Sequence, residues 1–347
     1  MKSYQELWQS LTPLYDAGEA QAIVRLVLEV KYGMTLTDII GGKVNELSAN
    51  EGKNLEEMIE RLQNAEPVQY VLGQADFMGR TFHVEPGVLI PRPETAELCQ
   101  WIIKREEALV EFLKKKWNPI DYGFPLSTVI KGLGLSDKVK GLSTEDATKV
   151  AHDYWENGEF IHPLILDFCT GSGCIATTLN LSIKNSKAIG IDISDQALKI
   201  AELNAKQLEA PSSSFRKEDV LFLSSSFKSS NLREELLGDK KTYCDIIVCN
   251  PPYICENEKA DMARNVLKYE PSLALFVPDK NPLLFYHAVA KIGKELLHMG
   301  GMLYFEMNPL YADDIKQMLE DMGYIEVEIK EDSFGKKRMI RAKRYLE

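Results

Sequence analysis

The sequence Asn250-Pro251-Pro252-Tyr253 brings together groups that can hold a planar amino or amide nitrogen. The side-chain carbonyl of Asn250 can accept one N–H, and the backbone carbonyl of Pro251 can accept the other. Because proline restricts φ, two successive prolines fix the direction of that carbonyl. Tyr253 can line the pocket or stack on the planar group. Hydrogen bonds to both protons would expose one face of the nitrogen to an electrophile and disperse the charge that develops there.

The position of this motif favours a catalytic role over a simple turn. Residues 245–249 form an apolar stretch that predicts a β-strand, and the motif follows it directly. Ligands of open α/β sheets bind beyond the carboxyl ends of the strands. A tight turn after a strand is the alternative interpretation. No strong general base is required, because the product cation is acidic enough to release its proton to water.

A second motif predicts a cofactor site. Residues 167–174 read Asp-Phe-Cys-Thr-Gly-Ser-Gly-Cys and join an expected strand to an expected helix. Gly171 and Gly173 allow a sharp turn and a close approach of a ligand to the backbone. The N-terminus of the following helix can receive a negative group such as a carboxylate. Asp167 and Thr170 belong to the same turn and are included in the candidate cofactor site, and Asn250 is expected to border the cofactor as well as the substrate.

Two acidic residues follow at the ends of the next two expected strands. Asp192 lies about 20 residues further on and can accept hydrogen bonds from both hydroxyls of a ribose. Asp219 can accept a hydrogen bond from an adenine amino group. Asp192 could instead cap the next helix, a role for which Asp195 competes. The order of these residues favours a nucleoside cofactor, whereas Ala176 breaks the Gly-x-Gly-x-x-Gly pattern and weakens a dinucleotide interpretation.

The elements that would position these residues alternate between strand and helix. We expect strands at 164–168, 188–193, before Asp219, at 245–249 and at 302–306, and helices through 175–181, 195–208 and 283–297. This alternation predicts an α/β domain with a mainly parallel sheet covered by helices on both faces. Residues 324–329 and 339–342 flank a polar stretch and predict an antiparallel pair added to that sheet.

The first half of the chain has a different pattern. Residues 4–64 carry apolar side chains at helical spacing and predict a small helical domain. Residues 68–91 predict a β-hairpin, with 70–72 and 88–90 as strand-like runs, and a helix follows through 98–103. Residues 104–163 are least informative, with short helices expected around 144–154. We therefore expect a helical substrate-binding domain at 1–66, a bridge at 67–103, an insertion at 104–163 and a catalytic domain at 164–347.

The composition restricts the possible partners. The chain has 347 residues, a net charge of −11 and a pI near 5.2, so it is a poor default binder of nucleic-acid backbone. No run of about 18 apolar residues predicts a membrane span. The N-terminus resembles neither a secretory signal nor a transit peptide, and we expect a cytoplasmic protein without membrane association. The six cysteines form no Cys-x-x-Cys pair, which favours reduced, buried thiols over a metal site.

Several segments resemble the HemK/PrmC family of protein-(glutamine-N5) methyltransferases, which act on peptide-chain release factors. The matching segments are 67–73 (Pro-Val-Gln-Tyr-Val-Leu-Gly), 90–95 (Ile-Pro-Arg-Pro-Glu-Thr), 171–176 (Gly-Ser-Gly-Cys-Ile-Ala), 250–253 (Asn-Pro-Pro-Tyr) and 269–275 (Tyr-Glu-Pro-Ser-Leu-Ala-Leu). The resemblance covers most of the chain, including the N-terminal helices. Adenine-N6 DNA methyltransferases share the Asn-Pro-Pro-Tyr motif, whereas the segment 90–95 is far more specific to this family.

The resemblance implies a Rossmann-like class I methyltransferase fold and S-adenosylmethionine as cofactor. It also implies methylation of the glutamine in the Gly-Gly-Gln loop of release factors one and two. Asn250 and the Pro251 carbonyl would hold that glutamine, with Pro252 and Tyr253 completing the motif.

The resemblance further assigns roles around the pocket. The two glycines of the cofactor turn would line the methionine part of the cofactor, Asp192 the ribose, and Asp219 with Val220 the adenine. Arg92 and Glu94 would shape the substrate pocket, although capping and pairing at the start of a helix would explain them equally well. The N-terminal helical domain would hold the release factor.

The chain departs from the family pattern at three places. Cys169 stands where many members have the first glycine of the cofactor turn, and we expect a slightly different turn with cofactor binding retained. Residues 306–308 read Glu-Met-Asn in place of Glu-Ile-Gly. The insertion at 104–163 replaces a short connection, and we interpret it as passive rather than as a lid or a partner surface.

Three rival functions stay open at this point. A nucleic-acid adenine methyltransferase would use the same logic at Asn250, but it would need a basic groove and base flipping. A methyltransferase acting on a glutamine of a ribosomal protein is separated less well by the sequence. A non-catalytic binding protein would not need both an intact Asn-Pro-Pro-Tyr motif and Asp192.

Overall fold

The structure is a computed structural model that describes residues 2–116, 125–132, 135–156, 161–225, 232–238 and 242–345. Its chain forms two compact units. The first unit comprises Met1–Pro91 and Ile254–Lys280, and the second comprises Arg92–Tyr253 and Asn281–Glu347. The four segments expected from the sequence were defined by function, whereas these two units are defined by contacts. The four functional segments therefore stay predictions.

The first unit begins with four α-helices, which confirms the helical region expected at 4–64. They are α1 (Tyr4–Gln9), α2 (Ala17–Tyr32), α3 (Leu36–Ile40) and α4 (Ala49–Gln63). Ser3, Thr35 and Ser48 each form a capping box with the acidic residue three positions later, which satisfies the exposed amides of the first turn. The apolar faces of these helices pack into one buried cluster that includes Leu11, Leu28 and residues 55–62.

The hairpin of the bridge is present, but two of its expected strand runs are wrong. The strands β1 (Gln74–Phe77) and β2 (Arg80–His83) pair antiparallel. Residues 70–72 instead belong to a single-turn helix, α5 (Val68–Leu72), which ends at Gly73 with a left-handed φ of 74°. All three side chains are buried, and so short an apolar run does not distinguish helix from strand. Residues 88–90 form no strand. The amide of Val88 donates to the carbonyl of Glu85 within a turn, and the amide of Ile90 donates to the side chain of Glu270, so neither pairs with a neighbouring strand.

Residues 254–280 complete the first unit. They contain the two-residue strands β7 (Ile254–Cys255) and β8 (Phe276–Val277), with α13 (Arg264–Tyr269) and α14 (Ser272–Leu275) between them. The Tyr269 hydroxyl donates to the carbonyl of Asn64 at 2.8 Å, and the amide of Ile90 donates to Glu270 at 3.2 Å. The family-like segment 269–275 therefore joins two distant parts of the sequence within one unit.

The second unit contains a seven-stranded sheet in the order β10-β11-β9-β6-β3-β4-β5. The parallel strands are β3 (Leu164–Phe168), β4 (Lys187–Asp192), β5 (Ser213–Lys217), β6 (Cys244–Cys249) and β9 (Leu297–Glu306). The strands β10 (Tyr324–Glu331) and β11 (Lys337–Arg344) pair antiparallel with each other, and β11 pairs antiparallel with β9. The mainly parallel sheet with an antiparallel C-terminal pair is thus confirmed.

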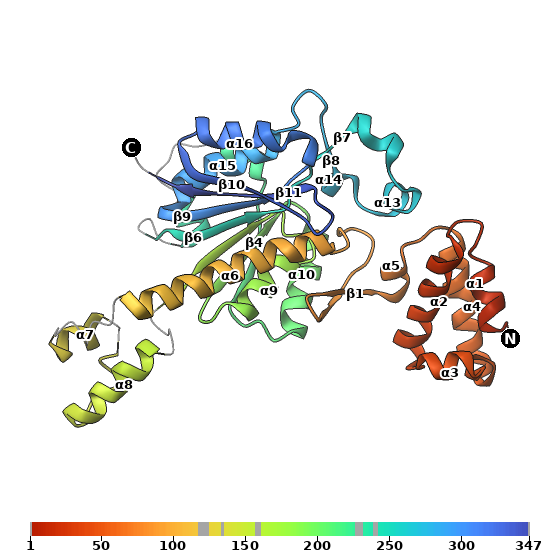
Figure 1. Ribbon diagram of the computed structural model, residues 1–347, viewed down its shortest axis with the longest axis horizontal. Helices are drawn as coiled ribbons and strands as arrows, with labels where there is room; N and C mark the ends of the chain where they lie inside the picture. The colour runs from red at the N-terminus through yellow and green to blue at the C-terminus, as the bar shows by residue number, and fades with distance from the viewer. Residues whose placement is uncertain are drawn as a thin grey trace. The chain divides into compact units, whose positions relative to one another are not determined.

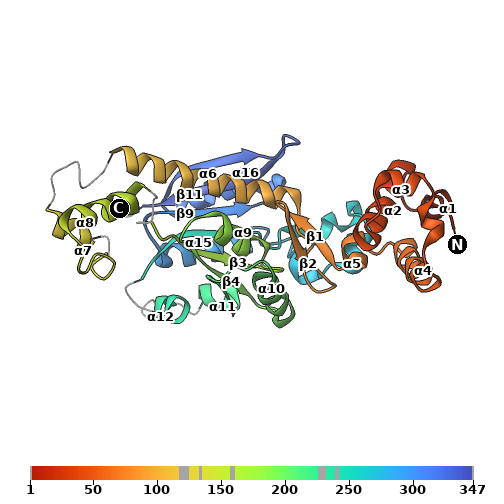
Figure 2. The ribbon, with the colours of Figure 1, turned by 90° about the horizontal axis from the view of Figure 1, so that it is seen from below.

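Helices cover both faces of this sheet (Figure 1). The helices α9 (Cys174–Ser182) and α10 (Asp195–Gln207) lie on one face with α6 (Pro93–Lys116), and α15 (Leu284–Leu296) and α16 (Ala312–Asp321) lie on the other. The short helices α11 (Val220–Ser225) and α12 (Leu232–Leu237) pack against α15. Figure 2 shows α6 running along its face of the sheet. A large buried cluster of this unit lies mainly between the sheet and the helices α15 and α16, and it includes Tyr286 and Phe305.

The helix expected to end near Ile103 continues to Lys116 as α6. Its buried positions Leu98, Ile102 and Glu106 recur every four residues, so one face packs inward beyond the expected end. The helix expected around 144–154 is confirmed as α8 (Thr144–Glu156), which contacts α7 (Leu126–Gly132) through a small cluster of its own. Residues 117–124, 133–134 and 157–160 of the expected insertion lie outside the described residues.

Candidate active site

The turn between β3 and α9 has an unusual backbone. Cys169, Gly171 and Gly173 have φ values of 58°, 54° and 75°, which lie in the left-handed region that favours glycine. Cys169 thus adopts a backbone conformation typical of glycine, at a cost of about 1–2 kcal/mol for a residue with a Cβ. A Cβ on Gly173 would lie 2.8 Å from that of Ala201, whereas a Cβ on Gly171 would meet nothing within 4 Å. Gly173 is therefore required for packing, whereas Gly171 faces open space.

Asp167 holds this turn from beneath. Its Oδ2 accepts hydrogen bonds from the Thr170 hydroxyl at 2.5 Å and from the amide of Ala176 at 3.1 Å. Burial raises the pKa of the Asp167 carboxyl to about 7, with the two hydrogen bonds acting in the opposite direction. Oδ1 of Asp167 is buried and has no hydrogen-bond partner among the described residues.

Asp192 lies at the carboxyl end of β4 and binds the same turn. Its Oδ2 accepts from the amide of Gly171 at 2.9 Å, and its Oδ1 accepts from the amide of Ser194 at 3.0 Å. Burial raises the pKa of the Asp192 carboxyl. The Ser194 side chain caps α10, so neither Asp192 nor Asp195 supplies that cap. A carboxylate offers about four lone-pair sites, so Asp192 keeps accepting capacity for a ligand beside its bonds to backbone amides.

Asp219 and Val220 lie at the junction of β5 and α11. Asp219 Oδ1 accepts from the amides of Leu221 at 2.8 Å and Phe222 at 3.3 Å, which is the geometry of a helix N-cap. The Val220 side chain belongs to the buried core, so the groups it can offer a ligand are chiefly those of its backbone. The adenine-binding role of Asp219 and Val220 stays a prediction, and Asp219 has a structural role as the cap of α11.

The Asn-Pro-Pro-Tyr motif follows directly after β6. Pro251 and Pro252 are buried, whereas Asn250 and Tyr253 are partly exposed. Asn250 Nδ2 donates to the hydroxyl oxygen of Thr95 at 3.2 Å. No described residue donates to Asn250 Oδ1, so the carbonyl end of this side chain keeps its accepting capacity.

A buried carboxylate connects the two ends of this motif. Glu306 is 1% exposed, and its Oε2 accepts from the Thr95 hydroxyl at 2.5 Å while its Oε1 accepts from the Tyr253 hydroxyl at 3.1 Å. Burial raises the pKa of Glu306, against the effect of these two bonds and of Arg338. Burial raises the pKa of Tyr253 as well, followed by the effect of Glu306.

Arg92 and Glu94 flank the first residue of α6. The Arg92 carbonyl accepts from the amide of Ala96 at 3.2 Å, and this bond forms the first turn of α6. Glu94 lies in the first turn, where a negative charge is favourable to the helix dipole. Glu94 is also close enough to Glu306 and Tyr253 to raise the pKa of both. From this one position, Glu94 can both stabilise the start of α6 and border the predicted substrate pocket.

The replacement of glycine by Asn308 fits this loop. Asn308 has an ordinary φ of −70°, so its backbone does not require glycine. Its Oδ1 accepts from the amide of Leu310 at 3.1 Å, and its Nδ2 donates to the Tyr253 carbonyl at 3.2 Å. Asn308 therefore caps the short helix η3 (Pro309–Tyr311) and holds the backbone of the Asn-Pro-Pro-Tyr motif.

The parallel strands bring these residues to one edge of the sheet. β3, β4, β5, β6 and β9 all run in the same direction, and the predicted groups follow their carboxyl ends. No local pattern in the sequence predicts a role for Thr95, Glu306 or Asn308. Thr95 belongs to the family-like segment 90–95, and Glu306 ends an expected strand. These positions could be noticed in the sequence, but their hydrogen bond to each other could not be predicted from it.

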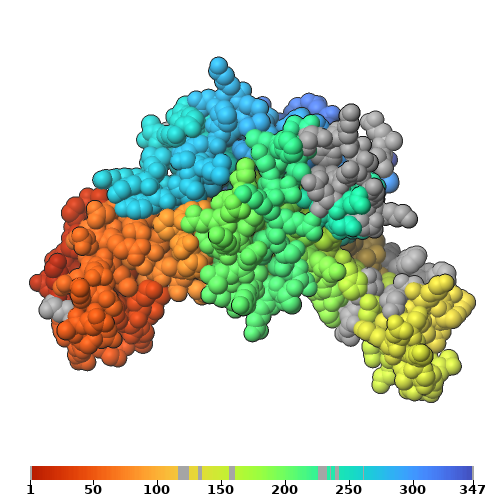
Figure 3. Space-filling view, turned by 180° about the vertical axis from the view of Figure 1, so that it is seen from behind, coloured from red at the N-terminus to blue at the C-terminus, as the bar shows by residue number. Residues whose placement is uncertain are grey.

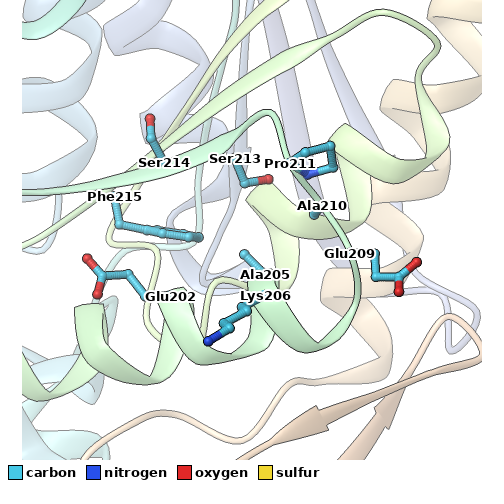
Figure 4. A pocket seen from close by; sticks show the side chains of 9 residues that line it. All are labelled: Glu202, Ala205, Lys206, Glu209, Ala210, Pro211, Ser213, Ser214 and Phe215. Carbon is cyan, nitrogen blue, oxygen red and sulfur yellow. The ribbon is translucent and has the colours of Figure 1, made fainter.

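A broad hollow of about 800 Å³ lies elsewhere on this unit (Figure 4). It is lined by the C-terminal part of α10 and the start of β5, a region coloured green and exposed in Figure 3. This is the amino end of β5, whereas the candidate site lies at the carboxyl ends of the strands. The hollow includes none of the predicted site residues.

Other kinds of site have little support in the described residues. All six cysteines are free thiols, and every one except Cys169 is buried. Over the same ranges, no group of three or more His, Cys, Asp and Glu side chains is arranged to hold a metal ion. No helix within the described parts of the chain is long and apolar enough to span a bilayer.

Comparison with known proteins identifies two family models in the chain. A PrmC N-terminal domain matches residues 9–73, and a methyltransferase domain matches residues 164–281. A release factor glutamine methyltransferase of Bacteroides thetaiotaomicron is 39% identical over 336 residues, which are 97% of each chain. One from Flavobacterium psychrophilum is 31% identical over 98% of each chain. A solved methyltransferase from Pyrococcus furiosus aligns with a TM-score of 0.36 and 15% identity, covering 58% of this chain and 85% of that one.

Proposed function

The chain belongs to the release factor glutamine methyltransferase family, and from this premise we propose that it methylates a glutamine side-chain nitrogen of a peptide-chain release factor. The target is the glutamine of the Gly-Gly-Gln loop. The observation that carries this proposal is the state of Asn250. Its Nδ2 is bound by Thr95, and its Oδ1 is left to accept from a substrate.

The groups of the Asn-Pro-Pro-Tyr motif suit an amide substrate. Asn250 Oδ1 and the Pro251 carbonyl accept the two N–H groups of the glutamine. With both N–H groups bound in the amide plane, the face of the nitrogen above that plane is left open to the methyl group. Correct placement of reacting groups accounts for much of the rate. Tyr253 borders the pocket with its hydroxyl tied to Glu306. Arg92 and Glu94 shape the entrance from the start of α6.

The cofactor is S-adenosylmethionine, which supplies an electrophilic methyl group when it is bound. The residues of this chain fit it. The open space beside Gly171 leaves room for a ligand against the backbone, and the unpaired Oδ1 of Asp167 leaves an acceptor at the base of the turn. Gly171 and Gly173 would hold the methionine part together with Asp167 and Thr170.

The nucleoside part would be held by the next two strands. Asp192 would accept from the ribose hydroxyls through the lone pairs that its backbone bonds leave unused. Asp219 would accept from the adenine amino group while it caps α11. The backbone of Val220 would border the adenine ring.

The remaining parts of the proposal concern the protein substrate. The N-terminal helices, which match the PrmC N-terminal domain, would bind the release factor. Because release factors act in translation, this activity belongs in the cytoplasm. No direct nucleic-acid contact is needed, and the net charge of −11 disfavours an adenine methyltransferase, which needs a basic groove.

A substrate comparison tests the proposal. The full chain is incubated with labelled S-adenosylmethionine and one of four acceptors, which are a release factor, its loop Gln→Ala variant, a ribosomal protein mixture and duplex DNA. We expect label only on the unaltered release factor. Label on DNA would replace the proposal with adenine methylation, and label on a ribosomal protein alone would move it to that substrate.

A further inference from the structure

Three side chains of the second unit form a hydrogen-bonded chain that ends at Asn250. Glu306 Oε2 accepts from the Thr95 hydroxyl at 2.5 Å, and Asn250 Nδ2 donates to the same hydroxyl oxygen at 3.2 Å. Thr95 and Glu306 are 2% and 1% exposed, so water does not replace these bonds. We name the set Asn250, Thr95 and Glu306 the orienting relay.

The direction of each bond follows from the number of protons available. A carboxylate only accepts, so Glu306 takes the single hydroxyl proton of Thr95. The Thr95 oxygen then has only lone pairs to offer, and the group facing it must donate. Asn250 can meet this requirement with its NH2 end alone. The carbonyl end would place two acceptors against each other without a proton between them.

We propose that Thr95 and Glu306 are positioning residues that fix the Asn250 amide with its carbonyl oxygen towards the substrate nitrogen. This inference rests on the proposed function, because the fixed carbonyl is useful only to a substrate that donates N–H. An amide rotated by half a turn would present NH2 to the NH2 of the glutamine, and a donor would then face a donor. The relay therefore selects the productive one of two arrangements with nearly the same shape.

The second oxygen of Glu306 strengthens this constraint. Its Oε1 accepts from the Tyr253 hydroxyl at 3.1 Å, so both oxygens of the carboxylate receive O–H donors. Charge-assisted hydrogen bonds of this kind are roughly twice as strong as neutral ones. One buried charge thus orients residues at both ends of the Asn-Pro-Pro-Tyr motif.

The relay works only while Glu306 is ionised. A protonated Glu306 can donate to the Thr95 oxygen. The Thr95 hydroxyl is then free to donate to Asn250, so Asn250 no longer has to present its NH2 end. Burial raises the pKa of this carboxyl, so the loss occurs at a higher pH than for an exposed glutamate. The groups that shift the pKa of Glu306 are Thr95 and Glu94 of α6, Tyr253 after β6 and Arg338 of β11. Glu306 in turn raises the pKa of Cys174 of α9 and Tyr286 of α15, which also face it.

Three variants of the full chain separate orientation from packing. Thr95→Val keeps the shape and removes the hydroxyl, Thr95→Ser keeps the hydroxyl, and Glu306→Gln supplies a donor at every pH. We expect Thr95→Val and Glu306→Gln to lower kcat for release-factor methylation by at least about tenfold, and Thr95→Ser to restore most of it. Affinity for S-adenosylmethionine, measured by calorimetry, should change little in all three.

The pH profile gives a readout that a merely structural role would not move. The wild-type kcat should fall as the pH drops below the pKa of Glu306, and this acid limb should vanish in Glu306→Gln. A Thr95→Val variant with wild-type kcat would overturn the inference. So would a Thr95→Ser variant as impaired as Thr95→Val, or an acid limb that persists in Glu306→Gln.

A spectroscopic measurement separates this inference from the proposed function. The side-chain NH2 protons of Asn250, assigned by their loss in Asn250→Asp, should exchange slowly with solvent in the wild type and in Thr95→Ser. They should exchange faster in Thr95→Val. Slow exchange together with no methylation of release factor would refute the proposed function and support the relay. Equal exchange rates in the wild type and Thr95→Val would refute the relay whatever the substrate.

Discussion

Several residues of the site use part of their hydrogen-bonding capacity within the protein and keep the rest for a ligand. Asn250 is bound through its nitrogen, and its oxygen has no donor among the described residues. Asp192 and Asp219 bind backbone amides and keep lone pairs. Such double use places a side chain accurately, because the bonds that fix it do not depend on the ligand.

Asp167 allows a prediction about pH and stability. Burial raises its pKa from 3.8 to about 7, so between these values the folded protein keeps a proton that the unfolded chain has released. The contribution of this group to the free energy of unfolding is full below about pH 4 and is lost as the pH rises through 7. The carbonyl of an Asp167→Asn variant could still accept from Thr170 and Ala176 but would not titrate.

The measurement is urea unfolding of the wild type and Asp167→Asn between pH 4 and 8. We expect the stability difference, wild type minus variant, to decline by about 1 kcal/mol per pH unit towards pH 7 and then to level off. Asp76, an exposed carboxylate in the first unit, provides the control as Asp76→Asn. Parallel profiles for the wild type and Asp167→Asn would contradict the raised pKa.

At this scale, the sequence predicted the groups that lie at strand ends and missed those that act through them. Asp192 and Asn250 stand at recognisable positions at or just after apolar strands, and Asp219 follows an expected strand of mainly polar residues. The contact between Thr95 and Glu306 joins residues 211 positions apart, and no local pattern reports such a pairing. The capping role of Asp219 was also missed, because a strand end and a helix cap coincide at one residue.

Among the elements, the turn between β3 and α9 gives the sharpest test. Gly171 and Gly173 both have positive φ, but a Cβ on the first meets open space and a Cβ on the second collides with Ala201. We expect Gly171→Ala to cost about 1 kcal/mol of stability through its φ alone and to weaken S-adenosylmethionine binding strongly. Gly173→Ala should cost clearly more stability, because steric overlap is added to the strain.

Thermal unfolding and calorimetric titration of the two variants measure both effects. The pair controls for backbone strain, because the same substitution is made at two left-handed positions of one turn. Equal affinity of the wild type and Gly171→Ala for the cofactor would show that the open space beside Gly171 is not where the ligand lies.

The elements that differ from their sequence-based predictions share a physical cause. Residues 70–72 and the end of α6 were misjudged where packing, rather than local pattern, decides the conformation. The three-residue apolar run is buried in either conformation. The charged surface of residues 104–116 concealed a helix whose buried face continues through Glu106. The long strand–helix alternation after residue 164 was predicted well, because each of its apolar strands is bounded by clear turn residues.

For the molecule as a whole, the insertion provides a test of which segments the activity needs. We interpret the region between α6 and β3 as passive, and α7 and α8 share a small apolar cluster of their own. Replacing residues 117–160 by a short Gly-Ser linker, while keeping α6 intact, should leave cofactor affinity and release-factor methylation within about twofold of the wild type. A folded variant that binds cofactor but no longer methylates release factor would assign the region a role in substrate binding.

The central claim is that this chain methylates one glutamine of a release factor and that Asn250 holds that glutamine. The most direct test is tandem mass spectrometry of release factor treated with S-adenosylmethionine and either the wild type or Asn250→Ala. We predict one added methyl group, on the glutamine of the Gly-Gly-Gln loop, with the wild type alone, while both proteins bind the cofactor. A methyl group on any other residue, or an unchanged rate with Asn250→Ala, would contradict the account.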